Sequence, residues 1–110
     1  MPTPSERFER SMTKDNLWLY ILSLLKERDM YPYEIRGSIR EKFSFSPGNV
    51  TAYIVLKKLS AGGYVAVRKK DKGKGPQRTH YSITEKGERE LSKASAICAQ
   101  RLSFLRKKSL

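Results

Sequence analysis

The stretch from Ser46 to Gly63, SPGNVTAYIVLKKLSAGG, has the start, the periodicity and the end of a single helix. Ser46 can cap the free backbone N–H groups of a first turn, and Pro47 suits the first helical position. Gly62 and Gly63 can provide the left-handed residue that commonly ends a helix. We therefore expect a helix over residues 47–62.

The two faces of this expected helix differ. Its apolar residues recur every three or four positions and form a stripe that suits a core. They are Ala52, Val55, Leu56 and Leu59. The polar residues lie largely off this stripe, on a face that is free to contact a partner. They are Asn49, Thr51, Tyr53, Lys57 and Lys58.

Positive charge is concentrated from this helix onward. The chain has 110 residues and a formal net charge of +12. Residues 1–43 hold eight Lys or Arg against seven Asp or Glu, whereas residues 44–83 hold eight against one. A surface that faces phosphate requires such an excess. The alternative interpretation is a solvated helix with ordinary lysines.

Length and composition limit the class of protein. A chain of 110 residues with 38% hydrophobic residues fits one domain with a modest core. No apolar run reaches the roughly 20 residues that span a bilayer, and the N-terminus lacks the apolar centre of a signal peptide. One cysteine and one histidine provide neither a disulfide framework nor a zinc site. We expect a cytoplasmic protein with no enzymatic activity, cofactor, metal or membrane contact.

Two helices are expected before residue 46. Residues 15–28 are so densely apolar that they belong in the centre of a core or between two chains. Residues 32–43 begin with a proline, and their inner Gly37 lowers helix stability by about 1 kcal/mol relative to alanine. We interpret this glycine as a sign that another helix packs closely against residues 32–43 at this position. Two helices joined by a short turn, the second with a polar face, form a helix-turn-helix.

Residues 1–13 precede these helices and are expected to be a flexible arm that becomes ordered on a partner. A frayed terminus is the usual state of such a segment. Phe8 and Met12, at positions i and i+4, would also allow a short helix there.

A β-hairpin is expected after the glycine pair. Residues 64–68 and 80–83 have β-rich composition with alternation, and the residues between them are rich in glycine, proline and charge. A basic segment over residues 68–78 can reach a phosphate strand or a minor groove beside the helix, whereas a solvated loop is the alternative. The candidate contact residues are Lys69, Lys70, Lys72, Lys74 and Arg78.

A last helix is expected to start after Thr84, which can cap it. Its apolar residues repeat every three or four positions over roughly 30 Å. A core this small does not cover both this helix and residues 15–28, so we expect a second copy of the chain to do so, with packing on its own domain as the alternative. The candidate dimer residues are Leu17, Trp18, Ile21, Leu91, Ala94, Cys98, Leu102 and Leu105.

Five short stretches occur in order within residues 17–95. They are YPYEIRGSI (31–39), SPG (46–48), Tyr53 followed by LKKL (56–59), GGYV (62–65) and QRTHYSITEKGEREL (77–91). Together they resemble the PadR family of winged-helix transcriptional regulators, although SPG lies two residues further upstream of the leucines than is usual there. The resemblance implies a homodimer, joined by the C-terminal helix, that binds a pseudo-palindromic operator and usually represses.

The expected fold is therefore mainly α with a small β-hairpin (α+β), a winged helix-turn-helix with an extra C-terminal dimerisation helix. Residues 1–13 form the arm, residues 14–83 the DNA-binding domain, and residues 84–110 the dimerisation helix and a basic tail.

The expected function is sequence-specific binding of double-stranded DNA by a nucleoid-associated regulator, with helix 47–62 in the major groove and the wing on the backbone. Apart from Asn49 the helix offers no bidentate base reader, so much of the affinity should depend on salt. Two further hypotheses remain open. One is a basic architectural or RNA-associated protein without a defined operator, and the other adds a small aromatic effector at the dimer interface near Trp18.

Overall fold

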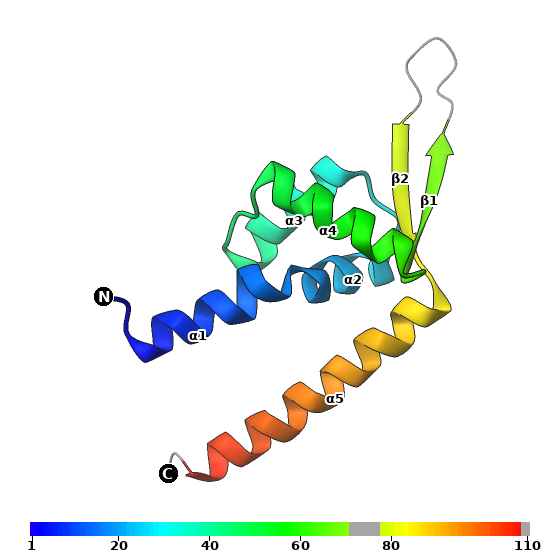
Figure 1. Cartoon of the computed structure of the whole chain (residues 1–110). Helices are drawn as coiled ribbons and strands as arrows, with labels where there is room; N and C mark the ends of the chain where they lie inside the picture. Colours follow the sequence, from blue (N-terminus) through cyan, green and yellow to red (C-terminus); the bar gives the residue numbers. More distant parts are fainter. Residues whose placement is uncertain (71–77, 109–110) are drawn as a thin grey trace.

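The computed structural model describes residues 1–70 and 78–108. In these ranges a series of helices is followed by one hairpin and then by a long C-terminal helix (Figure 1). The elements are α1 (Pro4–Thr13), a 3₁₀ turn η1 (Lys14–Asn16), α2 (Leu17–Glu27), α3 (Pro32–Phe43), α4 (Asn49–Ala61), β1 (Val65–Lys70), β2 (Arg78–Ile83) and α5 (Glu85–Lys108). This order confirms the predicted helical fold with a small hairpin and a long C-terminal helix.

The core is built around α2, which packs against α3, α4, α5 and β2. A helix that is apolar on nearly every side has to be covered on nearly every side, and this requirement gathers the other elements around it. Burial of each large aliphatic side chain contributes roughly 1.5–3 kcal/mol. Those with the least exposure are Ile21, Leu22, Leu24, Leu25, Ile35, Ile39 and Leu56.

The predicted start of α4 is wrong by two residues, whereas its predicted end at the glycine pair is correct to within one residue, because the helix ends at Ala61. The helix starts at Asn49, and its N-cap residue is Gly48, so no side-chain hydrogen bond caps the first turn. Ser46 does not cap this helix because it lies two residues before the N-cap, and its hydroxyl instead accepts a hydrogen bond from Arg40 Nε at 3.3 Å. At the other end Gly63 adopts the left-handed conformation, with φ 81°.

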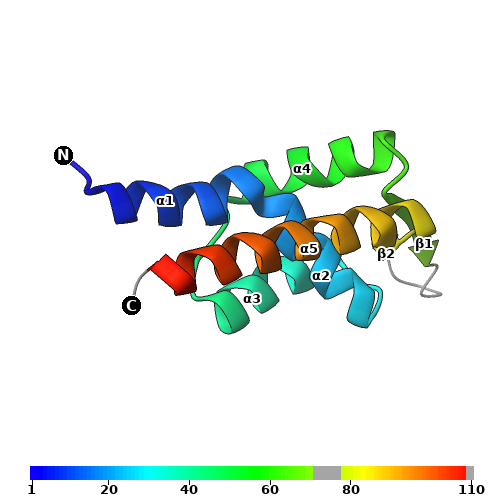
Figure 2. The ribbon, with the colours of Figure 1, turned by 90° about the horizontal axis from the view of Figure 1, so that it is seen from below.

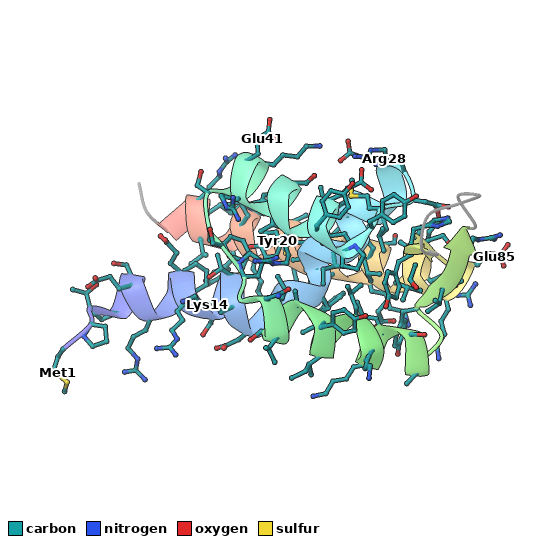
Figure 3. All side chains as sticks on the ribbon, turned by 90° about the horizontal axis from the view of Figure 1, so that it is seen from above. Met1, Lys14, Tyr20, Arg28, Glu41 and Glu85 are labelled. Carbon is teal, nitrogen blue, oxygen red and sulfur yellow. The ribbon has the colours of Figure 1, made fainter. Side chains whose placement is uncertain are left out.

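The N-terminal segment is a helix, which corrects the expectation of a flexible arm. Thr3 and Glu6 form a reciprocal capping box, in which Thr3 Oγ1 accepts from Glu6 N and Glu6 Oε1 accepts from Thr3 N. The Tyr20 hydroxyl, near the centre of Figure 3, donates to the Met12 carbonyl at 2.5 Å and so ties the end of α1 to α2. No residue of α1 is buried.

The hairpin pairs β1 with β2 in antiparallel register, from Val65 opposite Ile83 to Lys70 opposite Arg78. It projects beyond the helices in Figure 1. At its base, Met30 in the turn between α2 and α3 exchanges two backbone hydrogen bonds with Tyr81, at 2.9 and 3.1 Å. This pair fixes the hairpin against the helical core.

Thr84 caps α5, as predicted. Its hydroxyl oxygen accepts from Gly87 N at 3.1 Å, and its O–H donates to the Gly63 carbonyl at 2.7 Å. The first turns of α5 pack against α2 and β2, and the helix then continues across the molecule to the C-terminus, as Figure 2 shows. Leu91 is its last large apolar residue that packs on the core.

Two helical glycines allow a matched test of this packing. Contrary to our expectation of a close helix approach, a Cβ at Gly37 would meet no atom within 4 Å. A Cβ at Gly87 would collide with the Tyr64 carbonyl oxygen and approach Ile83 to 2.8 Å. We expect Gly37→Ala to raise the free energy of unfolding by about 1 kcal/mol and Gly87→Ala to lower it by about 2 kcal/mol in urea denaturation. A destabilised Gly37→Ala variant would contradict this packing.

Candidate nucleic-acid interface

The outer face of α4 carries all five of the polar residues selected from the sequence. Asn49, Thr51, Tyr53, Lys57 and Lys58 are exposed, and Tyr53 retains 49% of its accessible surface. The opposite face packs into the core through Ala52, Leu56 and Leu59. The prediction of one buried and one exposed face is therefore correct.

Two aliphatic residues in the middle of this exposed face were not selected from the sequence. Val50 is 72% exposed and Ile54 is 48% exposed. At 100° per residue they share the centre of the face with Lys57, while Tyr53 lies toward one edge and Thr51 toward the other. Sequence reasoning missed them because it assigned apolar helix residues to the core and polar ones to a partner.

An aromatic hollow lies beside Tyr53, between α4, the first turn of α3 and β2. Its walls are Tyr31, Pro32, Tyr33, Tyr53 and Thr79. The rings of Tyr31 and Tyr33 stack with an interplanar angle of 4° and centroids 5.9 Å apart, and Tyr33 is 61% exposed. Phenol rings of this kind can pack on a sugar and hydrogen-bond a phosphate. The sequence indication for this hollow was the pair of tyrosines in Tyr31-Pro32-Tyr33, which line it.

Neighbouring groups hold the aromatic hollow in place. The Tyr31 N–H donates to Glu34 Oε1 at 2.9 Å, and the Tyr31 ring meets the buried His80 edge-on at 5.7 Å. Burial, and to a smaller extent the nearby Tyr53, raise the pKa of Tyr81. The hollow is thus supported from both the turn before α3 and the hairpin.

The basic residues of the hairpin fall into two groups. Lys69 and Lys70 lie in β1 and Arg78 lies in β2, at the end of the hairpin away from the core. Lys72 and Lys74 lie outside the described residues. The paired strands therefore bring Lys70 and Arg78 to directly opposite positions, which places basic residues on both strands at the hairpin's outer end.

The residues predicted for a dimer interface separate into three environments. Leu17 and Ile21 are 2% and 0% exposed within the chain's own core, so they have no surface left for a second copy. Trp18 is partly buried and lines a small pocket with Leu59 and Tyr64. The other predicted residues lie on α5. Leu91 and Ala94 are partly buried, whereas Cys98, Leu102 and Leu105 are exposed.

Neither a metal centre nor a membrane span is found in residues 1–70 and 78–108. No three side chains of His, Cys, Asp or Glu gather in a way that would hold a metal ion there. None of the helices in these ranges has the length and apolarity needed to cross a bilayer.

A helix-turn-helix of α3 and α4, followed by a hairpin with basic residues at its end, defines the winged-helix class of DNA-binding proteins. The chain belongs to the PadR-like family of transcriptional regulators, whose model matches residues 21–93. Proteins of this family are DNA-binding regulators and not enzymes, which confirms both the predicted family and the predicted absence of catalysis.

Solved structures agree with this assignment. A transcriptional regulator from Clostridium thermocellum is 29% identical with a TM-score of 0.73, over 84% of this chain and 91% of that one. A PadR family regulator from Clostridium difficile R20291 is 27% identical with a TM-score of 0.67, over 83% of this chain and 91% of that chain. Bacillus subtilis PadR in complex with operator DNA is 28% identical with a TM-score of 0.65, over 70% and 45%. A comparison with curated protein sequences finds no match.

The exposed lysines of α4 give the first test of this interface. We expect Lys57→Ala to weaken binding to all DNA duplexes alike, and to reduce the slope of log affinity against log salt by about 1, because one phosphate contact is lost. Fluorescence anisotropy over a series of salt concentrations measures both quantities.

Lys93→Ala is the matched control, because Lys93 is an exposed lysine that belongs to α5 and not to α4. Its Nζ lies 3.7 Å from Glu90 Oε2. We expect this variant to bind DNA like the wild-type protein. Equal effects of the two substitutions would mean that net charge, and not the face of α4, determines the affinity.

Proposed function

We propose that this protein is a homodimeric, sequence-specific DNA-binding regulator that acts as a repressor. In this proposal α4 enters the major groove and residues 68–78 of the hairpin lie on the DNA backbone. The observation that carries the proposal is the uncovered face of α4 next to the aromatic hollow and the basic hairpin, in a chain of the PadR-like family. The operator DNA in the B. subtilis PadR structure supports the same partner here.

The distal half of α5 supports the homodimer. Ile97, Leu102, Phe104 and Leu105 are each between 49% and 60% exposed. So much apolar surface on one helix is unusual in a monomeric protein and favours contact with a second chain. We propose that Leu91, Ala94, Cys98, Leu102 and Leu105 contact the partner together with Trp18, while Leu17 and Ile21 serve the core of each copy.

Twofold symmetry then determines how the dimer meets DNA. Two copies of α4 would enter successive major grooves about 34 Å apart, which favours a pseudo-palindromic operator. In this proposal residues 14–83 bind DNA and residues 84–110 form the dimer contact, while residues 1–13, largely α1, carry the exposed Phe8. A regulator that binds chromosomal DNA acts in the cytoplasm, at the nucleoid.

A small aromatic effector near Trp18 belongs to this proposal as its regulatory part. Trp18 lines a pocket of about 210 Å³ with Leu22, Leu59, Tyr64 and Glu90. Because Trp18 is the only tryptophan of the chain, a bound aromatic compound would change the intrinsic fluorescence directly.

Selection from random-sequence DNA duplexes at two salt concentrations tests the proposed function. We expect enrichment of a palindromic motif with half-sites about 10 base pairs apart, because a symmetric dimer reads both halves alike. Strong, steeply salt-dependent binding without an enriched motif would instead favour the architectural or RNA-associated protein. An absence of binding at low salt would contradict DNA binding altogether.

The dimer contact is tested by placing a charge in the apolar surface of α5. We expect Leu102→Asp to raise the dimer dissociation constant by at least about 30-fold, because burying an unpaired carboxylate is costly. Light scattering with size-exclusion chromatography gives the mass, and circular dichroism checks that the fold persists. Ser103→Asp adds the same charge at the next, polar position of the helix and should leave the dimer intact. A wild-type monomer would contradict the proposal.

A further inference from the structure

The centre of the exposed face of α4 is aliphatic, although the helix belongs to a strongly basic chain. Val50 and Ile54 are separated by one helical turn and are 72% and 48% exposed. Neither residue belongs to the buried core or to the partly buried apolar residues that pack on it. β-branched residues are also less favourable than alanine or lysine in a helix, so they give α4 no local advantage.

Chemistry limits what such a pair can read in a major groove. Among the four bases only thymine presents an apolar group there, its C5-methyl, and aliphatic side chains contact it favourably. Cβ atoms one helical turn apart are separated by about 5–6 Å, whereas stacked bases of one strand are about 3.4 Å apart. Val50 and Ile54 can therefore reach thymines one or two steps apart.

The neighbouring residues favour DNA over an apolar protein partner at this surface. Lys57 and Lys58 follow on the same exposed face, where they would border the aliphatic pair with positive charge. Asn49 precedes Val50, and its carboxamide can pair with the N6 and N7 edge of adenine, the partner of thymine. The described part of α4 offers no Arg, Gln or second Asn for reading guanine or adenine.

We propose that Val50 and Ile54 read the methyl groups of thymines, so that α4 selects half-sites with A·T pairs at the positions they contact. This inference rests on the proposed function, because it requires α4 to lie in the major groove. Sequence selection by this helix then depends on apolar contacts at its centre, with Asn49 at its first turn. The lysines supply affinity without regard to sequence.

Replacing thymine by uracil tests the proposal, because it removes the C5-methyl and leaves base pairing unchanged. The duplex most enriched in the selection is made in two versions, one with thymine and one with uracil. If no duplex is enriched, the random-sequence pool is made in the same two versions. For wild-type protein we expect about fourfold weaker binding for each contacted methyl that is removed. Val50→Ala should bind thymine DNA more weakly and lose the roughly fourfold discrimination per half-site that its own methyl contact supplies, while the discrimination that Ile54 supplies remains. Ile54→Ala should lose discrimination in the same way.

Val67→Ala is the matched control, since Val67 is an exposed valine that belongs to β1 and not to α4. We expect this variant to keep the full difference between thymine and uracil duplexes. Helix loss does not confound Val50→Ala, because alanine favours a helix more than valine does. Equal binding of both duplexes by wild-type protein would overturn the thymine inference alone, whereas absence of binding to either would overturn the proposed function and the inference with it.

Discussion

The burial of α2 is the constraint on which the rest of the structure depends. Ile21, Leu22, Leu24 and Leu25 are almost completely removed from solvent, and no single neighbouring element can cover them all. Helices α3, α4 and α5 and the strand β2 each cover a part of this helix. Because α4 uses Ala52, Leu56 and Leu59 for this purpose, its opposite side is left free. The exposed face of α4, which we propose lies on DNA, is thus a direct consequence of how the core is closed.

A second contact connects the core to the side of the molecule that carries the exposed face of α4. The backbone pair of Met30 and Tyr81 joins the turn before α3 to the hairpin. Tyr31 follows directly, and its ring lies between Tyr33 on one side and His80 of β2 on the other. The start of α3, the face of α4 and the hairpin are therefore held in one arrangement. Such preorganisation lowers the cost of ordering side chains when a partner binds.

Periodicity and end signals in the sequence predicted most of the fold, including the bounds of α3, the end of α4 and the Thr84 cap. The errors arose where tertiary contacts decide. Ser46 bonds to Arg40 and lies two residues before the N-cap of α4, and Gly37 borders open space instead of a helix. The aromatic hollow and the exposure of Val50 were not predicted, because composition alone does not tell which side of a helix the core leaves uncovered.

In the proposed dimer, symmetry would give selectivity to base contacts on α4 that are individually weak. One methyl contact discriminates about fourfold, which is too little to identify an operator. A twofold dimer repeats each contact, and free energies of well-separated contacts add, so two contacts per helix would multiply to roughly 250-fold over a full site. Lysine contacts with phosphate add affinity for every sequence alike and leave this ratio unchanged. In the proposed dimer the apolar surface of α5 and the aliphatic centre of α4 would therefore be connected, because the first would assemble the pair of helices that the second needs in order to discriminate.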